Sequence, residues 1–572
     1  MSYISRLANR IFFIFCLAAC QTIPLQNLQQ KKVFGTIAKN GMVASAHALA
    51  SAVGVEILKK GGNAADASVA VFFALAVVYP RAGNIGGGGF AVCRWNTGEK
   101  TTLDFRETAP KKASRDMYLD SNGNANTNLS LFGHLAAGVP SSVDGMVELH
   151  QKYGRMAWAD LLQPAIELAE KGFAITANDA EYLHKYQQDF IKQNPIHLPK
   201  HFIKPMWKEG DMLYQTDLAK TLKRIQIGGK KGFYEGETAT LLLQEMERGK
   251  GLVSKEDLQN YHSIWRKPLL GNYKKYQIIT MPPPSSGGIA LLQLLRASEK
   301  YPLRKWGHNT AKTMHVMTEM ERRVYADRAS YLGDPDFFAV PQEMLLNKNY
   351  IAKRMATIRM TEKTPSEQVK EGKVKQIDSY ETTHLSIVDA DRNAIAITTT
   401  LNGNYGCKVM VAGAGFFLNN EMDDFSIKPG VANQFGLVGG EANAIVANKR
   451  MLSSMTPTII EEEGKLLMVL GTPGGSTIIT SVYQTILNVL EHKMTMQEAV
   501  DAKKFHHQWQ PDEVILEEKS FGEPLQKELQ KLGHILRYVH SLGRMDCVLV
   551  LPNGNLEGGS DHHRGDNTSL GY

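Results

Sequence analysis

The residues best suited to catalysis are a hydroxyl pair, Thr382-Thr383, placed where a polar stretch meets a strand-like one. Residues 361–381 are charged and polar without apolar periodicity, which is typical of an exposed segment that is easily cut. A threonine inside a chain is a weak nucleophile, but at a new N-terminus its own α-amine, with a pKa of about 8, can serve as its base. A cut between Glu381 and Thr382 would therefore create the nucleophile and its base together.

The elements around this pair predict a β-hairpin. Residues 382–389 and 394–402 are rich in β-branched side chains, and the turn between them carries Asp and Asn. The hairpin would place Thr382 at the start of its first strand. On these residues alone, an ordinary surface hairpin after a polar linker is the alternative, and the choice between Thr382 and Thr383 is open.

The segment Thr382-Thr383-His384-Leu385-Ser386-Ile387-Val388-Asp389 resembles the start of the small subunit of γ-glutamyltransferases. The resemblance extends in order from about Gly41 to Tyr572. Members of this family are N-terminal-nucleophile hydrolases, made as one precursor that cuts itself in two. The resemblance implies an α+β fold, a four-layer αββα sandwich built from two fragments of one precursor. The parts would be a signal peptide at 1–20, a large subunit at 21–381 and a small subunit at 382–572.

A second pattern indicates where an oxyanion could be stabilised. An apolar strand-like run is followed by Gly471-Thr472-Pro473-Gly474-Gly475-Ser476 and then by a helical pattern. A strand, glycine turn and helix in this order point backbone N–H groups at an anion. The resemblance assigns the oxyanion hole to Gly474 and Gly475. It also implies that Thr400 hydrogen-bonds and positions Thr382, although a solvent-facing strand threonine is the alternative.

The substrate that the resemblance implies is a γ-glutamyl compound such as glutathione, with a free α-carboxylate and a free α-amine. Arg106, at the end of a strand-like run, would hold the carboxylate with two parallel hydrogen bonds, which suits a planar guanidinium. By the same resemblance the Ser453 and Ser454 hydroxyls assist it. On the residues alone, an ion pair between Arg106 and Asp104 or Glu107 is the alternative.

The resemblance assigns the substrate amine to Asn402, Glu421 and Asp424. Carboxylates recognise an ammonium group, and an amide adds a directed hydrogen bond. A solvated acidic cluster is the alternative, and calcium is discounted because the spacing of an EF-hand is absent. Residues 425–441, rich in glycine, are predicted to cover the site. Phe435 stands where several bacterial relatives have tyrosine, so an aromatic lid is possible without a hydrogen-bonded gate.

The reaction implied is acyl transfer. Thr382 would attack the Glu381 carbonyl and split the precursor, and then attack the γ-glutamyl carbonyl to form an acyl-enzyme. Cysteinylglycine leaves, and water or the amine of an amino acid or dipeptide takes the glutamyl group. No cofactor or metal is implied, and structural or surface roles are assigned to His506-His507 and His562-His563. The alternatives are another amidase of the superfamily, such as a cephalosporin acylase, or an uncleaved protein that binds amino acids or peptides.

The N-terminus predicts export. Arg6 and Arg10 precede an apolar run, residues 11–19, that resembles a secretory signal and is too short to span a membrane. Residues 17–20 look like a bacterial lipobox, which would make Cys20 a lipid anchor, and a plain signal peptide is the alternative. The bacterial periplasm is the predicted location.

Composition agrees with a large globular enzyme. The chain is 43% hydrophobic and 22% charged, and its net charge of +7 is scattered, which gives nucleic-acid binding little support. The remaining cysteines, Cys93, Cys407 and Cys547, are widely spaced and are predicted to be buried free thiols. Residues 43–60 are predicted to form a helix, and residues 67–79 a buried core helix. A long amphipathic helix is expected at 310–331.

Overall fold

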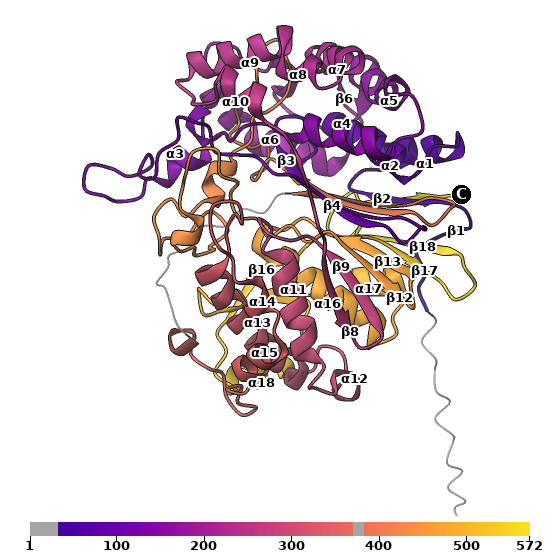
Figure 1. Cartoon of the computed structure of the whole chain (residues 1–572), viewed down its shortest axis with the longest axis vertical. Helices are drawn as coiled ribbons and strands as arrows, with labels where there is room; N and C mark the ends of the chain where they lie inside the picture. Colours follow the sequence, from indigo (N-terminus) through magenta and orange to yellow (C-terminus); the bar gives the residue numbers. More distant parts are fainter. Residues whose placement is uncertain (1–31, 370–381) are drawn as a thin grey trace, which may run out of the picture.

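The computed structural model describes residues 32–369 and 382–572. Two seven-stranded antiparallel sheets lie face to face between two layers of helices (Figure 1). This confirms the predicted four-layer αββα sandwich. The expectations for residues 1–20, Cys20 and Glu381 lie outside the described residues.

The sheet that carries the predicted nucleophile is here called sheet 1. In spatial order its strands are β19 (Thr568–Gly571), β2 (Met42–Ser45), β10 (Thr383–Val388), β11 (Ala394–Thr400), β3 (Gly88–Arg94), β4 (Lys100–Phe105) and β7 (Ile264–Arg266). Sheet 2 has the order β1 (Thr36–Ala38), β18 (Leu556–Ser560), β17 (Asp546–Val550), β13 (Lys465–Gly471), β12 (Thr458–Glu462), β9 (Tyr276–Thr280) and β8 (Leu269–Tyr273). Both sheets combine strands from before and after the proposed cut. A cut at residue 382 would therefore leave two fragments joined by ladders of backbone hydrogen bonds.

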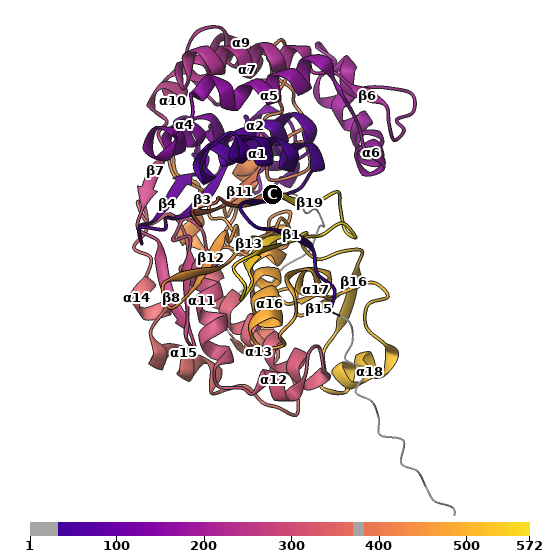
Figure 2. The same ribbon diagram turned by 90° about the vertical axis from the view of Figure 1, so that its right-hand side faces the viewer.

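The helices form two layers, one outside each sheet (Figures 1 and 2). Sheet 1 is covered by α1 (Ala48–Lys59), α2 (Ala64–Val78), α4 (Ser142–Tyr153), α5 (Trp158–Lys171), α6 (Ala177–Gln193), α7 (Thr216–Gly228), α8 (Lys231–Tyr234), α9 (Gly236–Arg248) and α10 (Lys255–Asn260). Sheet 2 is covered by α11 (Gly287–Ser298), α12 (Leu303–Trp306), α13 (Ala311–Tyr331), α14 (Gln342–Leu345), α15 (Lys348–Met355), α16 (Ile478–Leu490), α17 (Met496–Asp501) and α18 (Glu523–Lys531). A small sheet of β14 (Phe505–His506), β15 (Val514–Glu517) and β16 (Leu536–Val539) flanks the second layer.

Helix α2 is the buried core helix that the sequence predicts. Every one of its side chains is buried, as its continuous apolar run requires. It starts three residues earlier than predicted because Asn63 and Asp66 form a capping box at its N-terminus. The predicted helix at 43–60 is wrong at its start, where Met42–Ser45 forms strand β2 between β10 and β19. Pairing within the sheet overrides the local helical pattern there.

Helix α13 has the predicted length but not the predicted amphipathic character. It begins after the Thr310 cap, and nearly all of its side chains are buried, including charged ones. Arg322 and Arg323 both pair with Glu319, at 3.1 Å and 2.8 Å between nitrogen and oxygen. Charges that suggest a solvated face in the sequence are therefore paired inside the molecule.

Two further expectations concern thiols and membranes. Cys93, Cys407 and Cys547 are buried and free, as predicted for this part of the chain. None of the helices in residues 32–369 and 382–572 is long and apolar enough to cross a membrane.

The C-terminal strand β19 lies at the edge of sheet 1 (Figure 2). There the backbone oxygen of Tyr572 accepts a hydrogen bond from Asn40 N at 2.7 Å.

Candidate active site

The predicted hairpin occupies the centre of sheet 1. Strand β10 pairs with β11 from Thr383 opposite Thr399 onward, and the outer edges of the two strands pair with β2 and β3. Thr382 immediately precedes β10, and the same register carried one residue further places it opposite Thr400. Both threonines are almost fully buried, at 3% exposed. A central hairpin fixes the spacing of the two hydroxyl residues far more rigidly than a surface hairpin would.

Thr382 and Thr400 line one small cavity of about 20 Å³, room for about one water molecule. The cavity gathers site residues predicted from distant parts of the sequence, namely Arg106, Asn402, Asp424, Ser453, Ser454 and Gly475, and Phe435 lines it as well. Two predicted site residues lie outside its lining. Glu421 does not line the cavity but contacts Arg106, and Gly474 lines a neighbouring groove.

Arg106 is fully buried and surrounded by carboxylates. Its Nη1 lies 2.7 Å from Glu421 Oε2 and 3.4 Å from Glu107 Oε2, while its Nη2 donates to Asp424. The contact with Glu107 is the ion pair that the sequence offered as an alternative. From Arg106, Asp104 accepts a hydrogen bond from the backbone N–H, at 3.0 Å, and not from the guanidinium. Burial alone would lower the pKa of Arg106, but the carboxylates of Glu421, Glu107 and Asp424 together raise it. The arginine therefore stays charged.

The carboxyl groups around Arg106 are harder to ionise than free ones. Burial raises the pKa of Glu107 to about 8, against the opposing pull of Arg106. Burial also raises the pKa of Glu421 and of Asp424, with Arg106 again opposing the shift. One guanidinium can compensate only one negative charge in full, so the cluster can shed its excess charge by taking up protons.

The residues predicted to bind the amine are tied to the catalytic pair through Asn402. Asn402 has a φ of +74° and its backbone N–H donates to Thr400 Oγ1 at 2.7 Å. Its side-chain amide donates to Asn420 O at 2.9 Å, next to Glu421. Asn402 therefore connects the end of the hairpin to the acidic segment.

The predicted serines contact an arginine that sequence reasoning did not single out. Arg328, on α13, lines the cavity and donates from Nη2 to Ser454 Oγ at 3.2 Å and from Nε to Ser286 Oγ at 3.0 Å. Ser453 Oγ accepts from Met455 N at 3.1 Å, within its own loop. No serine bond to Arg106 is present among the described contacts. The cavity thus holds a second buried cation, which only the packing of α13 reveals.

The glycine turn follows β13 and leads into α16, in the predicted order of strand, turn and helix. Gly474 and Gly475 have φ values of +138° and +52°, which favour glycine. A Cβ atom on Gly475 would lie 2.4 Å from Phe435 Cδ1. Phe435 therefore covers this turn closely, and the loop that carries it is bonded to the acidic segment through Gln434 N and Asp423 Oδ2, at 2.9 Å.

Comparisons with known proteins show the family of this chain. The family pattern described as gamma-glutamyltranspeptidase matches residues 50–571. The chain belongs to the γ-glutamyltranspeptidase family. It is 44% identical over 562 residues to the glutathione hydrolase proenzyme of Escherichia coli (strain K12), covering 97% of this chain and 96% of that relative. Family membership makes the chain an enzyme.

Two solved structures resemble this chain, one at high sequence identity and one at low sequence identity. Helicobacter pylori gamma-glutamyltranspeptidase is 46% identical, covers 60% of this chain and 97% of its own, and superposes with a TM-score of 0.56. Cephalosporin acylase from Bacillus halodurans is 24% identical, covers 96% of this chain and 99% of its own, and has a TM-score of 0.82. At that identity the acylase demonstrates the shared fold alone.

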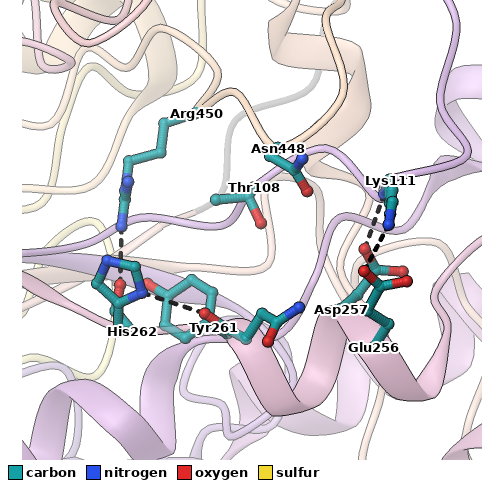
Figure 3. Close-up of a pocket in the computed structure, with 9 residues that line it drawn as sticks. Thr108, Lys111, Glu256, Asp257, Tyr261, His262, Asn448 and Arg450 are labelled. Carbon is teal, nitrogen blue, oxygen red and sulfur yellow. Dashed lines mark hydrogen bonds and ion pairs between the residues drawn. The ribbon is translucent and has the colours of Figure 1, made fainter.

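A wider cavity of about 300 Å³, shown in Figure 3, is lined by a different set of residues from the candidate site. Its charged groups are already paired, since Lys111 contacts Glu256 at 2.5 Å and Arg450 contacts Asp104 at 3.4 Å. Tyr261 joins it to the site, because the Tyr261 hydroxyl donates to Arg106 O at 2.9 Å. None of the predicted site residues is among the described residues that line this cavity.

The adjacent histidines do not form a metal site in the described residues. His506 bonds Thr480 Oγ1 at 2.8 Å, while His507 points toward Asp512 at 3.4 Å. Across residues 32–369 and 382–572, no three His, Cys, Asp or Glu side chains gather as metal ligands would.

Proposed function

We propose that the chain is a glutathione hydrolase and γ-glutamyltransferase whose nucleophile is Thr382. The observation that carries the proposal is the cavity that joins Thr382 and Thr400 to Arg106 and Asp424. It combines a candidate nucleophile with charged groups of both signs at a fixed distance from it. A γ-glutamyl compound offers a matching carbonyl and a zwitterionic head.

The ion pair between Arg106 and Asp424 supports this choice of substrate. Removing one partner of a buried ion pair costs several kcal/mol, about 3–5, because the other charge is left unpaired. A zwitterionic α-amino acid avoids this cost, since its carboxylate takes Arg106 while its ammonium takes Asp424 and Glu421. We therefore infer that the substrate head exchanges with the internal ion pair. Asn402 would add a directed bond to the ammonium, and Ser453 and Ser454 would border the carboxylate.

In the proposed maturation step, the Thr382 hydroxyl attacks the Glu381 carbonyl. The peptide bond to the Thr382 nitrogen breaks and an ester forms, which water hydrolyses to release the new N-terminus. Thr400 supports the geometry, because it lies opposite Thr382 and also accepts the Asn402 N–H. The two products would be the fragments 21–381 and 382–572.

In proposed turnover, the Thr382 hydroxyl attacks the γ-glutamyl carbonyl, and its α-amine takes the proton. The backbone N–H groups of Gly474 and Gly475 are proposed to stabilise the oxyanion. Collapse of the intermediate expels cysteinylglycine and leaves an ester on Thr382. Water completes hydrolysis, and the amine of an amino acid or dipeptide completes transfer. The chemistry needs no cofactor.

A cephalosporin acylase is the nearest rival. A glutaryl-type acyl group supplies a carboxylate for Arg106 but leaves the buried Asp424 and Glu421 without an ammonium. We expect γ-glutamyl-p-nitroanilide to be cleaved at least about a hundredfold faster than glutaryl-p-nitroanilide, from about 3 kcal/mol for the missing contact. Equal rates would favour the acylase.

The deciding experiment replaces the nucleophile and its neighbour. Thr382→Ala is expected to remain one band on a denaturing gel and to be inactive. Thr383→Val, an isosteric control at a fully buried position, is expected to give two bands and retain activity. N-terminal sequencing of the smaller fragment should begin at Thr382. A cut or active Thr382→Ala protein would refute the mechanism, and an uncut wild-type protein would instead favour a binding protein.

We also propose export to the bacterial periplasm, with Cys20 as a possible lipid anchor. The support is the basic and apolar pattern of residues 1–20. Labelled palmitate should enter the wild-type chain and not Cys20→Ser. Processing that is insensitive to globomycin would rule out the anchor and leave a plain signal peptide.

A further inference from the structure

We propose that His506 is a positioning residue that holds the Phe435 ring in place over the glycine turn, through a chain of hydrogen bonds. The inference rests on the proposed function, because it depends on the role of Gly475 in stabilising the oxyanion. His506 is on strand β14, which contacts both α13 and α16. It is fully buried and is not among the described residues that line the catalytic cavity. It can therefore affect the reaction only through its neighbours.

One end of the chain holds the loop that carries Phe435. The Gln508 side chain donates from Nε2 to Phe435 O at 3.0 Å, and its Oε1 lies 2.9 Å from His506 Nε2. Because a carbonyl oxygen can only accept, the first bond fixes which way the Gln508 amide points. His506 Nε2 must therefore carry a proton and donate a hydrogen bond to Gln508.

The other end of the chain reaches the glycine turn. Burial lowers the pKa of His506 to about 3, so the ring is neutral and its Nδ1 can accept a hydrogen bond. The Thr480 hydroxyl, 2.8 Å from Nδ1, is the donor. Thr480 is in the first turn of α16, and its Oγ1 also lies 3.1 Å from Thr477 O, in the 3-10 turn Gly475–Thr477. The hydrogen bonds therefore run in one direction, from the Thr480 hydroxyl to the Phe435 carbonyl, and bonds aligned in this way strengthen one another.

Tyr325 on α13 supports the same arrangement. Its hydroxyl donates to Ser476 O, and its ring meets the His506 ring edge to face, with the centroids 5.5 Å apart. On the cavity side, the Phe435 ring lies so close to the turn that a Cβ on Gly475 would be 2.4 Å from its Cδ1. The turn is therefore held by Tyr325 and by the Phe435 ring, and His506 is in contact with one and bonded through Gln508 to the other.

The chain of hydrogen bonds should affect the rate rather than substrate binding. Formation and hydrolysis of the acyl-enzyme both pass through an oxyanion at the glycine turn, so a less firmly held turn would slow both steps. The substrate head would bind elsewhere, at Arg106 and Asp424. Among the described contacts, the side chains of the chain bond to neither. Breaking the chain should therefore lower kcat and leave KM nearly unchanged.

The test removes one link and asks whether the Phe435 ring transmits the effect. Gln508→Met keeps the length of the side chain and removes both of its bonds. It should lower kcat for γ-glutamyl-p-nitroanilide about fivefold, as expected for a lost buried hydrogen bond, at an unchanged KM. In a Phe435→Ala background, which keeps the backbone carbonyl but lacks the ring, the same substitution should change kcat less than about twofold.

Gln484→Met is the matched control. Gln484 is as buried as Gln508, at 4% exposed, and donates to Phe505 O at 2.6 Å, next to His506. In the described contacts it has no bond to the loop that carries Phe435. Gln484→Met should lower the Tm about as much as Gln508→Met does, but it should not change kcat. A denaturing gel establishes that each variant is cut before the rates are compared.

If Gln508→Met does not fold, Thr480→Val breaks the other end of the chain and should follow the same pattern. Its control is Thr485→Val, at a fully buried position on the same helix. An effect on kcat that persists without the Phe435 ring, or that a control reproduces, would make these bonds merely structural and overturn the inference, as would an unchanged kcat. Wild-type protein that cleaves no γ-glutamyl-p-nitroanilide would instead refute the proposed function, so the two failures are distinguishable.

Discussion

The proposed nucleophile and the proposed substrate-head site are held in opposite ways. Thr382 and Thr400 lie on paired central strands, where backbone hydrogen bonds on both sides fix their positions. Glu421 and Asp424 come from a short 3-10 turn and Ser454 from a loop, and buried charges and side-chain bonds hold these segments. The two regions therefore suit two tasks. A strand can hold one attacking atom in place, whereas the charged groups of a paired cluster can exchange their internal partners for those of a substrate.

This division predicts that the two regions fail differently. Damage to the strand pair should stop both cleavage of the precursor and turnover. Damage to the charged cluster should spare cleavage, because that step uses a peptide bond of the chain itself and needs no bound zwitterion.

The largest expected effect that separates the regions comes from Arg106→Gln. It should lower kcat/KM for γ-glutamyl-p-nitroanilide about a thousandfold, from about 4 kcal/mol for a buried charge contact. Precursor cleavage should continue, since the neighbouring acids can take up protons instead of remaining unpaired charges. Steady-state kinetics and a denaturing gel measure the two outcomes. Arg115→Gln, an exposed arginine, should change neither. If the Arg106→Gln protein stays uncut, the charged cluster is also needed for precursor cleavage, and the two regions do not differ as predicted.

The oxyanion turn is the next test. Gly475→Ala should lower kcat about a hundredfold, because its Cβ would meet the Phe435 ring and displace the proposed donors. Adding Phe435→Ala should restore about tenfold, by making room for the methyl group. The remaining loss reflects the left-handed φ of +52°. If the second substitution restores nothing, the aromatic lid does not constrain the turn.

The sequence predicts the strand region better than the charged cluster, for a physical reason. The hairpin, the helix α2 and the glycine turn follow from local patterns of apolar and turn-forming residues, and the structure confirms these elements. Arg106 could be singled out as a cation at a strand end, but its contact with Asp424, 318 residues away, depends on the packing of two irregular segments. Arg328 could not be found at all, because charges on α13 resemble a solvated helical face. The roles of the individual site residues stay predictions.

Arg328 offers a smaller test within the cluster. Arg328→Met should raise the KM for γ-glutamyl-p-nitroanilide about tenfold, from about 1.4 kcal/mol for a charge-assisted bond to Ser454 Oγ. The kcat should change little, because the contacts of Arg328 are with Ser286 and Ser454 and not with the strand pair. Arg328→Lys should recover part of the loss by restoring the cation. A fall in kcat with an unchanged KM would assign Arg328 to the reacting carbonyl instead.

The last test measures stability and not turnover, through Asp423. Burial raises the pKa of this carboxyl to about 7, despite bonds from Gln434 N and Ser130 Oγ. The Ser130 hydroxyl also reaches Thr127 O at 2.9 Å, so it can donate there and accept a hydrogen bond from the protonated Asp423 carboxyl. When the pKa of an acid is higher in the folded state than in the unfolded state, the acid is protonated in the folded protein and ionised in the unfolded chain at any pH between the two values.

Folding therefore binds a proton between about pH 4 and pH 7, and this contribution to stability is lost as the pH rises toward 7. The full loss is at most about 4 kcal/mol, from about three pKa units. Asp423→Asn keeps the shape and removes the titration. The Tm of wild type minus that of Asp423→Asn should fall from pH 5 to pH 8, whereas the same difference for the exposed Asp116→Asn should stay flat. If the Tm difference between wild type and Asp423→Asn does not change with pH, Asp423 is ionised in the folded protein throughout this pH range.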